Sequence, residues 1–150
     1  MGVNSNIILK LHMYNYIKMT EFLREATLQT PSIAFNIDGV MIIKGRAIPD
    51  NPEPFWGDAL AWFDKYSENP CQITIFKIDL EYFNISSSKR ILFLLYKLNE
   101  IVERGFEAKV EWYYRKSDED MYEVGQDYAF MVKVPFEFKE YNDQDMAFAI

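Results

Sequence analysis

Strand-like and helix-like segments alternate along most of this 150-residue chain, and the alternation constrains the fold more than any other feature. Two apolar runs on either side of the pair Asp38-Gly39 predict a hairpin of antiparallel strands over residues 32–44. A further strand is predicted at residues 22–27. Helical and strand patterns then follow in the order α, β, α, β, α, β up to Tyr141. This order predicts an α/β sandwich with a mixed sheet, an N-terminal hairpin, about three helices and right-handed crossovers.

Each predicted helix has a recognisable start or end. The first helix, residues 51–67, begins with an Asn-Pro pair, in which asparagine is a suitable cap and proline suits the first helical position. The second helix, about residues 86–104, is followed by Gly105, a residue favoured just past a helix end. The third, residues 117–133, begins with a capping box of the form S-x-x-D, in which Ser117 is the predicted cap.

The strands that follow these helices are predicted at residues 72–83, 108–114 and 135–141. In the first of them the apolar residues alternate loosely, and a change of parity near Lys77 predicts a bulge there. The last begins after a proline and is typical of an edge strand. Because functional residues in such sheets gather at the carboxyl ends of the strands, we expect the site at the end of residues 72–83.

Length and composition favour one globular domain. With 49% hydrophobic residues, the chain can bury a full core, and we place the domain at residues 19–141. Residues 1–18 lack a clean period and are interpreted as a non-native or disordered extension, with an extra strand or short helix as the alternative; Met19 is then the initiator. Residues 142–150 form an acidic tail that we expect to fray.

Charge and cysteine content exclude several classes of partner. A net charge of -7 without any cluster of basic residues argues against nucleic acid or an anionic membrane as the ligand. The longest apolar run, residues 91–96, is far shorter than the roughly 20 residues of a membrane-spanning helix. Cys71 is the only cysteine, and the N-terminus does not have the pattern of a signal peptide, so we expect a cytoplasmic protein.

The sequence does not favour catalysis. His12 is the only histidine and lies in the N-terminal extension, whereas a serine or cysteine nucleophile needs an imidazole as its base. Metal sites built from cysteine and histidine fail for the same reason, and none of the common nucleotide-binding or hydrolase motifs occurs. We therefore expect no catalytic residue, no metal ligand and no cofactor.

Residues 84–89, with the sequence NISSSK, join the central strand to the second helix. Asn84 or Ser86 could cap the helix by accepting a hydrogen bond from a free backbone N–H. Three consecutive serines exceed what capping requires, and a phosphate at this position would face the positive end of the helix. Lys89 and Arg90, one turn further on, could assist an anion or remain solvated. Capping alone and a phosphorylation site both stay open from these residues.

Several spaced segments together resemble the SiaC family of bacterial regulatory phosphoproteins, over about residues 20–141. The segments are IKGRAIPDNPEPFW, LEYFNISSSK, VEWYYRKSDEDMYEVGQDY and PFEF. The resemblance implies a STAS-like fold without a catalytic centre. It also implies a partner switch: a cognate Ser/Thr kinase phosphorylates the protein, a PP2C-type phosphatase reverses this, and the unphosphorylated form binds and activates a GGDEF-type diguanylate cyclase. The expected output is cyclic-di-GMP signalling and biofilm formation.

The acceptor position departs from the family pattern. In that family the phosphate is usually carried by the threonine that follows the asparagine, and this position is Ile85 here. Two outcomes follow: the acceptor moves to Ser86 or Ser87, or the switch stays permanently unphosphorylated and able to bind its effector. We favour Ser86. The residues predicted to bind the partner are Tyr82, Asn84, Ser86, Lys89, Tyr113 and Tyr114.

Two other functions remain as alternatives. The first is an anti-sigma-factor antagonist that acts on transcription. The second is a small-molecule-binding or enzymatic α/β domain, which predicts a deep pocket lined by converging polar groups. Tyr113 and Tyr114 are adjacent strand residues, so one of them is expected to pack in the core instead of binding a partner.

Overall fold

The computed structural model describes residues 4–7 and 19–145 of the chain. Most of the predicted N-terminal extension, and the end of the predicted tail at residues 146–150, lie outside the described residues. The strands are β1 (Phe22–Arg24), β2 (Ser32–Phe35), β3 (Val40–Ala47), β4 (Ile73–Phe83), β5 (Glu107–Arg115) and β6 (Phe136–Tyr141). The helices of the domain are α2 (Pro52–Glu68), α3 (Ile85–Glu103) and α4 (Glu119–Met131).

The six strands form one mixed sheet in the order β1-β2-β3-β4-β5-β6. The pairs β1–β2 and β2–β3 are antiparallel, and the remaining pairs are parallel. The predicted hairpin is confirmed: Gly39 has φ 97, and the backbone N–H of Val40 donates to Asp38 Oδ1 at 3.0 Å. The mixed sheet with its N-terminal hairpin therefore agrees with the predicted STAS-like α/β sandwich.

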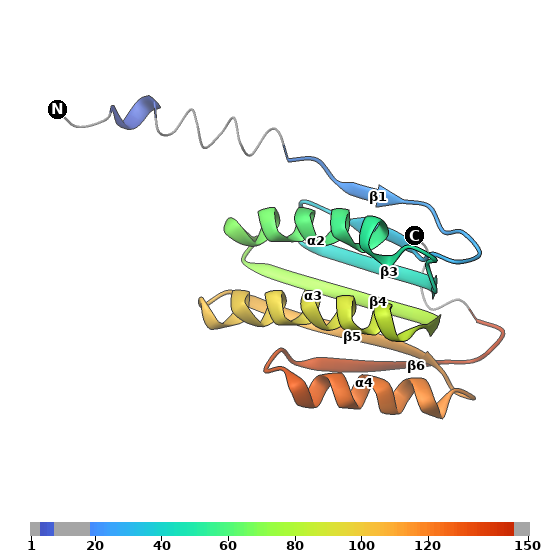
Figure 1. Cartoon of the computed structure of the whole chain (residues 1–150). Coiled ribbons are helices and arrows are strands. Elements are labelled where there is room, and N and C mark those ends of the chain that lie inside the picture. The colour runs from blue at the N-terminus through green and yellow to red at the C-terminus, as the bar shows by residue number, and fades with distance from the viewer. Residues whose placement is uncertain (1–3, 8–18, 146–150) are drawn as a thin grey trace.

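All three helices lie on one face of the sheet (Figure 1). This arrangement follows from the topology, because each crossover from β3 to β6 moves one strand in the same direction with the same hand. The opposite face, which we call the open face, carries no helix of the described chain. Side chains near the ends of the parallel strands therefore lie on one of two surfaces. One surface is beside the helices, and the other is the open face.

The core lies between the sheet and the helices and is rich in aromatic side chains. The rings of Phe35, Phe63 and Phe76 meet edge to face, with centroids 5.3–6.4 Å apart. Helix α3 buries an apolar stripe formed by Ile91, Leu94, Leu95, Leu98 and Ile101. Helix α2 buries Trp56, Ala59, Phe63 and Tyr66, while Phe55 is only partly covered.

The structure corrects the prediction for β4. Thr74, Phe76 and Ile78 are buried on the helix side, so the strand alternates regularly through Lys77 and has no bulge there. The register shift lies further along, where Gly45 pairs with Leu80 and Arg46 with Tyr82. Thr74 escaped recognition as a core residue because it is polar. Its hydroxyl lies 2.8 Å from the Tyr66 hydroxyl, and this hydrogen bond makes its burial tolerable.

Two predicted caps also differ. Helix α4 is capped by Asp118, whose Oδ1 accepts the N–H of Met121 at 3.0 Å, and not by Ser117. The Ser117 hydroxyl instead donates to Asp143 at 2.8 Å and holds the start of the tail. Asn51 occupies the N-cap position of α2, but its side chain makes no capping hydrogen bond. Among the helices that the structure describes, none has the length and apolar character to cross a membrane.

Candidate functional site at the start of helix α3

The junction between β4 and α3 is organised by one asparagine. Asn84 has an extended backbone, with φ -89 and ψ 175, and its Oδ1 accepts the N–H of Ser87 at 3.0 Å. The same oxygen accepts the Ser86 hydroxyl at 3.1 Å. The N–H of Asn84 donates to the carbonyl of Ala47 at 3.1 Å, which ties the junction to the end of β3. The prediction of a capped helix start is thus confirmed, with Asn84 as the cap.

The three serines of the junction have different environments. Ser87 is fully buried, and its Oγ accepts the indole N–H of Trp56 at 3.0 Å. Ser86 is half-buried, and its hydroxyl is bonded only to the neighbouring cap. The hydroxyl of Ser88 donates to the carbonyl of Ile85 at 2.7 Å, on the helix surface. Ser87 therefore has a structural role that disfavours it as a phosphate acceptor, and Ser86 is the more accessible of the two predicted acceptors.

Ile85 projects from the first turn of α3 and is 78% exposed. It borders a cavity of about 330 Å³ between the start of α3 and helix α4. The ring of Phe83 stacks on Tyr128 with centroids 6.5 Å apart, and the Tyr128 hydroxyl donates to the carbonyl of Ser88 at 2.9 Å. Burial raises the pKa of Tyr128, so this hydroxyl stays protonated as a donor. The residues that line the cavity are Phe83, Asn84, Ile85, Ser88, Val124, Asp127, Tyr128 and Met131.

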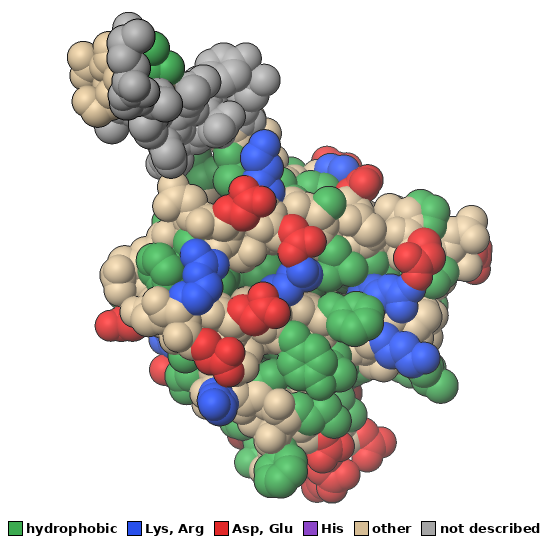
Figure 2. Space-filling model, turned by 60° about the vertical axis from the view of Figure 1, so that its left-hand side comes forward, with side chains coloured by type: hydrophobic (Ala, Val, Ile, Leu, Met, Phe, Trp, Pro, Cys, Tyr) green, Lys and Arg blue, Asp and Glu red, His purple; other side chains and the backbone are tan. Residues whose placement is uncertain are grey.

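This cavity is open to solvent, and most of its exposed lining surface is apolar. Figure 2 shows hydrophobic side chains gathered on the lower part of the face that it draws, around α3 and α4. The exposed large apolar residues of these two helices are Ile85, Phe93, Tyr96, Phe130 and Met131. Such a surface is typical of a site for a protein partner.

The other predicted partner-binding residues are divided among three surfaces. Lys89 is exposed on α3, one turn from the cap. Tyr114 packs against Tyr122 of α4, with ring centroids 4.9 Å apart. Tyr113 lies on the open face, and its hydroxyl donates to Glu111 Oε1 at 2.7 Å. Tyr82 pairs with Arg46 of β3, just beyond the register shift. The structure therefore brings Asn84, Ser86 and Lys89 together but places the three tyrosines elsewhere.

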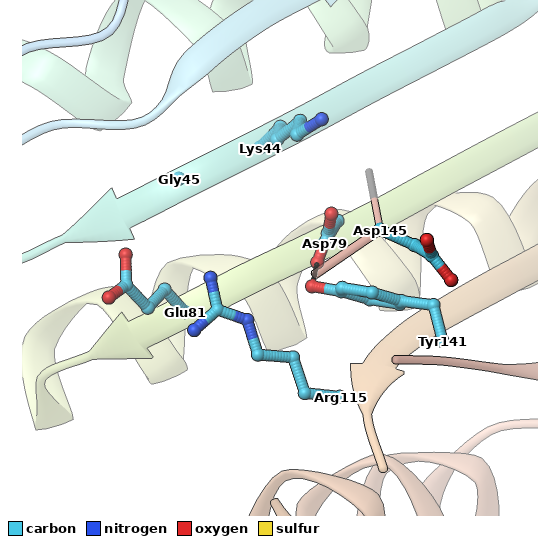
Figure 3. A pocket seen from close by; sticks show the side chains of 7 residues that line it. All are labelled: Lys44, Gly45, Asp79, Glu81, Arg115, Tyr141 and Asp145. Atoms are coloured by element: carbon cyan, nitrogen blue, oxygen red, sulfur yellow. Dashed lines mark hydrogen bonds between the residues drawn. The ribbon is translucent and has the colours of Figure 1, made fainter. Parts of the chain in front are cut away.

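A second pocket, of about 150 Å³, lies on the open face at the carboxyl ends of the parallel strands (Figure 3). The Tyr141 hydroxyl donates to Asp79 Oδ1 at 2.8 Å. Burial raises the pKa of the Asp79 carboxyl, and burial with this hydrogen bond raises the pKa of Tyr141 to about 12. The sequence interpretation missed this pocket because its lining residues come from β3, β4, β5, β6 and the segment after β6, which lie far apart in the sequence. The pocket is lined by Lys44, Gly45, Asp79, Glu81, Arg115, Tyr141 and Asp145.

Within the part of the chain that the structure describes, no three histidine, cysteine, aspartate or glutamate side chains are placed to hold a metal ion. The site is defined by the capped helix start, the half-buried Ser86 and the apolar surface beside it. These are the features of an α/β regulatory protein that binds another protein. The sequence model of the SiaC family regulatory phosphoproteins matches residues 24–141, and the chain belongs to this family.

Solved structures share the fold. A chain in the crystal structure of the diguanylate cyclase SiaD in complex with its activator SiaC, from Pseudomonas aeruginosa, matches with a TM-score of 0.77 and 21% identity. The match covers 80% of this chain and 99% of that one. Apo-SiaC of the same organism matches with a TM-score of 0.74 and 21% identity, over 81% and 99% of the two chains.

A curated relative is an uncharacterized protein of Pseudomonas aeruginosa strain UCBPP-PA14. It is 22% identical over 118 residues, which are 78% of this chain and 94% of that protein. At this level of identity the solved structures establish a common architecture, and the family match identifies the chain as a regulatory phosphoprotein.

Proposed function

We propose that the protein is a non-enzymatic partner switch whose unphosphorylated form binds and activates a GGDEF-type diguanylate cyclase. Membership of the SiaC family supports this proposal, as does the fold shared with SiaC, the activator of SiaD in Pseudomonas aeruginosa. A cognate Ser/Thr kinase and a PP2C-type phosphatase set the phosphorylation state. The switch acts in the cytoplasm and controls cyclic-di-GMP and, through it, biofilm formation.

Ser86 is the proposed acceptor, and its accessible hydroxyl at the start of α3 is the observation that carries this assignment. The usual family position holds Ile85, which has no hydroxyl, and the Ser87 oxygen is buried against Trp56. The kinase would transfer the terminal phosphoryl group of ATP to Ser86 Oγ, which loses its proton, and ADP leaves. The product phosphate lies at the positive end of the helix dipole.

The partner surface that we propose is the apolar region around Ile85 and Met131, together with Lys89. Both apolar side chains are more than half exposed, at 78% and 53%. A phosphate on Ser86 adds about two negative charges at the edge of this region, and those charges would have to lose water when a partner covers it. Phosphorylation should therefore weaken binding without refolding the domain.

Kinase treatment followed by mass spectrometry tests the acceptor assignment. We expect one phosphate on Ser86 of the wild-type protein, and none on the Ser86→Ala variant. The Ile85→Thr variant restores the usual family acceptor and serves as the positive control for the kinase. If this variant is phosphorylated on residue 85 while the wild-type protein stays unmodified, the switch is fixed in its binding state and the assignment of Ser86 is wrong.

A further inference from the structure

Helices α2 and α3 are joined at their N-terminal ends by two side-chain contacts. The Arg90 guanidinium forms an ion pair with Glu53 in the first turn of α2, and the Trp56 indole bonds to Ser87 one turn further along. The Arg90 side chain is only 17% exposed, whereas the Glu53 side chain is 75% exposed. Arg90 is therefore held against the protein, and its partner reaches it from the solvent side.

The first turn of α2 has few other restraints at its surface. It begins with Pro52, which has no N–H, and the side chain at its N-cap position makes no hydrogen bond. Glu53 is the acidic residue of this turn. The ion pair with Arg90 is consequently a polar side-chain contact that ties this turn to α3, and its loss should loosen the turn.

Ser86 and Arg90 are four residues apart in α3, so they lie on the same side of the helix, one turn apart. Long side chains on a helix lean toward its N-terminus, which directs the Arg90 guanidinium toward residue 86. A serine hydroxyl offers a weak neutral acceptor at this position. A phosphate offers about two charges and three acceptor oxygens, more than the single charge of the Glu53 carboxylate.

We propose that Arg90 is the phosphate-binding residue of the switch, and that modification of Ser86 moves its guanidinium from Glu53 to the phosphate. The first turn of α2 is then released from α3. This inference rests on the proposed acceptor role of Ser86. It explains how a charge added to α3 would change the contacts that α2 makes. The regulated surface therefore includes the start of α2 as well as the start of α3.

The test uses full-length protein with phosphoserine installed at position 86 during synthesis, so that it does not depend on any kinase. Phosphorus NMR follows the second ionisation of the phosphate, whose pKa in an unpaired phosphoserine is about 6. An arginine partner stabilises the dianion and lowers this pKa. In the Arg90→Gln variant we expect the pKa to rise by about half a unit, on the order of a threefold change in proton affinity.

Lys97→Gln is the matched control, because Lys97 also joins α3 to α2 through an ion pair, with Asp64, but lies three turns from Ser86. This variant should leave the phosphate pKa unchanged. An equal pKa in the wild-type and Arg90→Gln proteins would overturn the role of Arg90. That result would leave the proposed function intact, because the function is tested separately, by cyclase activation with and without phosphate on Ser86.

Hydrogen exchange provides a second readout, for release of α2. Phosphate on Ser86 should speed exchange of the amides at residues 55–57, which are the first in α2 with intrahelical acceptors. Glu53→Gln should speed the same amides without phosphate. Adding phosphate to the Glu53→Gln protein should then produce no further increase. Unchanged exchange in phosphorylated wild-type protein would contradict the release of α2, even if Arg90 binds the phosphate.

Discussion

Replacing Ser87 by alanine should destabilise the protein, although the change removes only one oxygen atom. The Ser87 hydroxyl accepts the indole N–H of Trp56 at 3.0 Å, and both side chains are fully buried. Alanine would leave this N–H without an acceptor and without access to water. A buried polar group that loses its partner costs about 1–3 kcal/mol of unfolding free energy.

Thermal denaturation followed by circular dichroism measures the effect. For a chain of this size, 1 kcal/mol corresponds to a shift in Tm of about 2–4 °C. The Ser87→Ala variant should therefore melt about 2–12 °C below the wild-type protein. Ser88→Ala is the matched control, because its hydroxyl bonds to a carbonyl at the helix surface. This control should change stability by no more than about 0.5 kcal/mol.

A double-mutant cycle separates the hydrogen bond from the packing of the indole. Trp56→Phe removes the donor and part of a fully buried side chain, so it destabilises by itself. In the double variant with Ser87→Ala, no orphan N–H remains, and the combined loss should be smaller than the sum of the single losses. A Ser87→Ala protein as stable as the Ser88→Ala control would refute the structural role assigned to Ser87.

Three further predictions concern other parts of the fold. Asn84→Ala should lower the unfolding free energy by about 1 kcal/mol in urea, because α3 loses its side-chain cap; an unchanged midpoint would argue against that cap. Gly57→Ala should stabilise the folded state by about 0.5–1 kcal/mol, because the added Cβ meets no atom within 4 Å. Gly125→Ala should destabilise it by about 1–3 kcal/mol, because the added Cβ would lie 2.6 Å from the Trp112 ring. If both variants shifted the midpoint of urea denaturation in the same direction, these two predictions would be contradicted. Burial raises the pKa of the Asp79 carboxyl in the folded state. The folded state therefore binds the carboxyl proton more tightly than the unfolded state does. The stability that this proton contributes is complete below the unfolded pKa and is lost as the pH rises through the folded pKa. Relative to Asp79→Asn, the wild-type protein should therefore lose stability as the pH rises above the unfolded pKa of about 4, and a pH-independent difference in urea denaturation would exclude this linkage.

Those parts of the fold that depend on neighbours in the sequence were predictable from it. The turn at Gly39 and the apolar stripe of α3 each follow from a short local pattern. The faces of β4 were not predictable in this way, because Thr74 is buried through a hydrogen bond to Tyr66 on another element. The position of the register shift likewise depends on how β3 and β4 pair. The sequence of one strand alone does not determine this pairing.

The features of the site likewise differ in whether they depend on neighbouring or on distant residues in the sequence. Asn84 and Ser86 are close in sequence, so the cap and the accessible serine could be inferred from the junction itself. The burial of Ser87 depends on Trp56, which lies 31 residues earlier and reaches it only when α2 packs on α3. The placement of Tyr113 on the open face depends on all three helices covering the other face, a property of the whole topology.

The central claim is that phosphate on Ser86 controls activation of a diguanylate cyclase. Its most direct test is the rate of cyclic-di-GMP synthesis by the cognate cyclase, titrated with unmodified protein and with protein carrying phosphoserine at position 86. The account predicts that unmodified protein raises the rate and that the phosphorylated form raises it much less at equal concentration. Equal activation by the two forms, or no activation by the unmodified form, would contradict it.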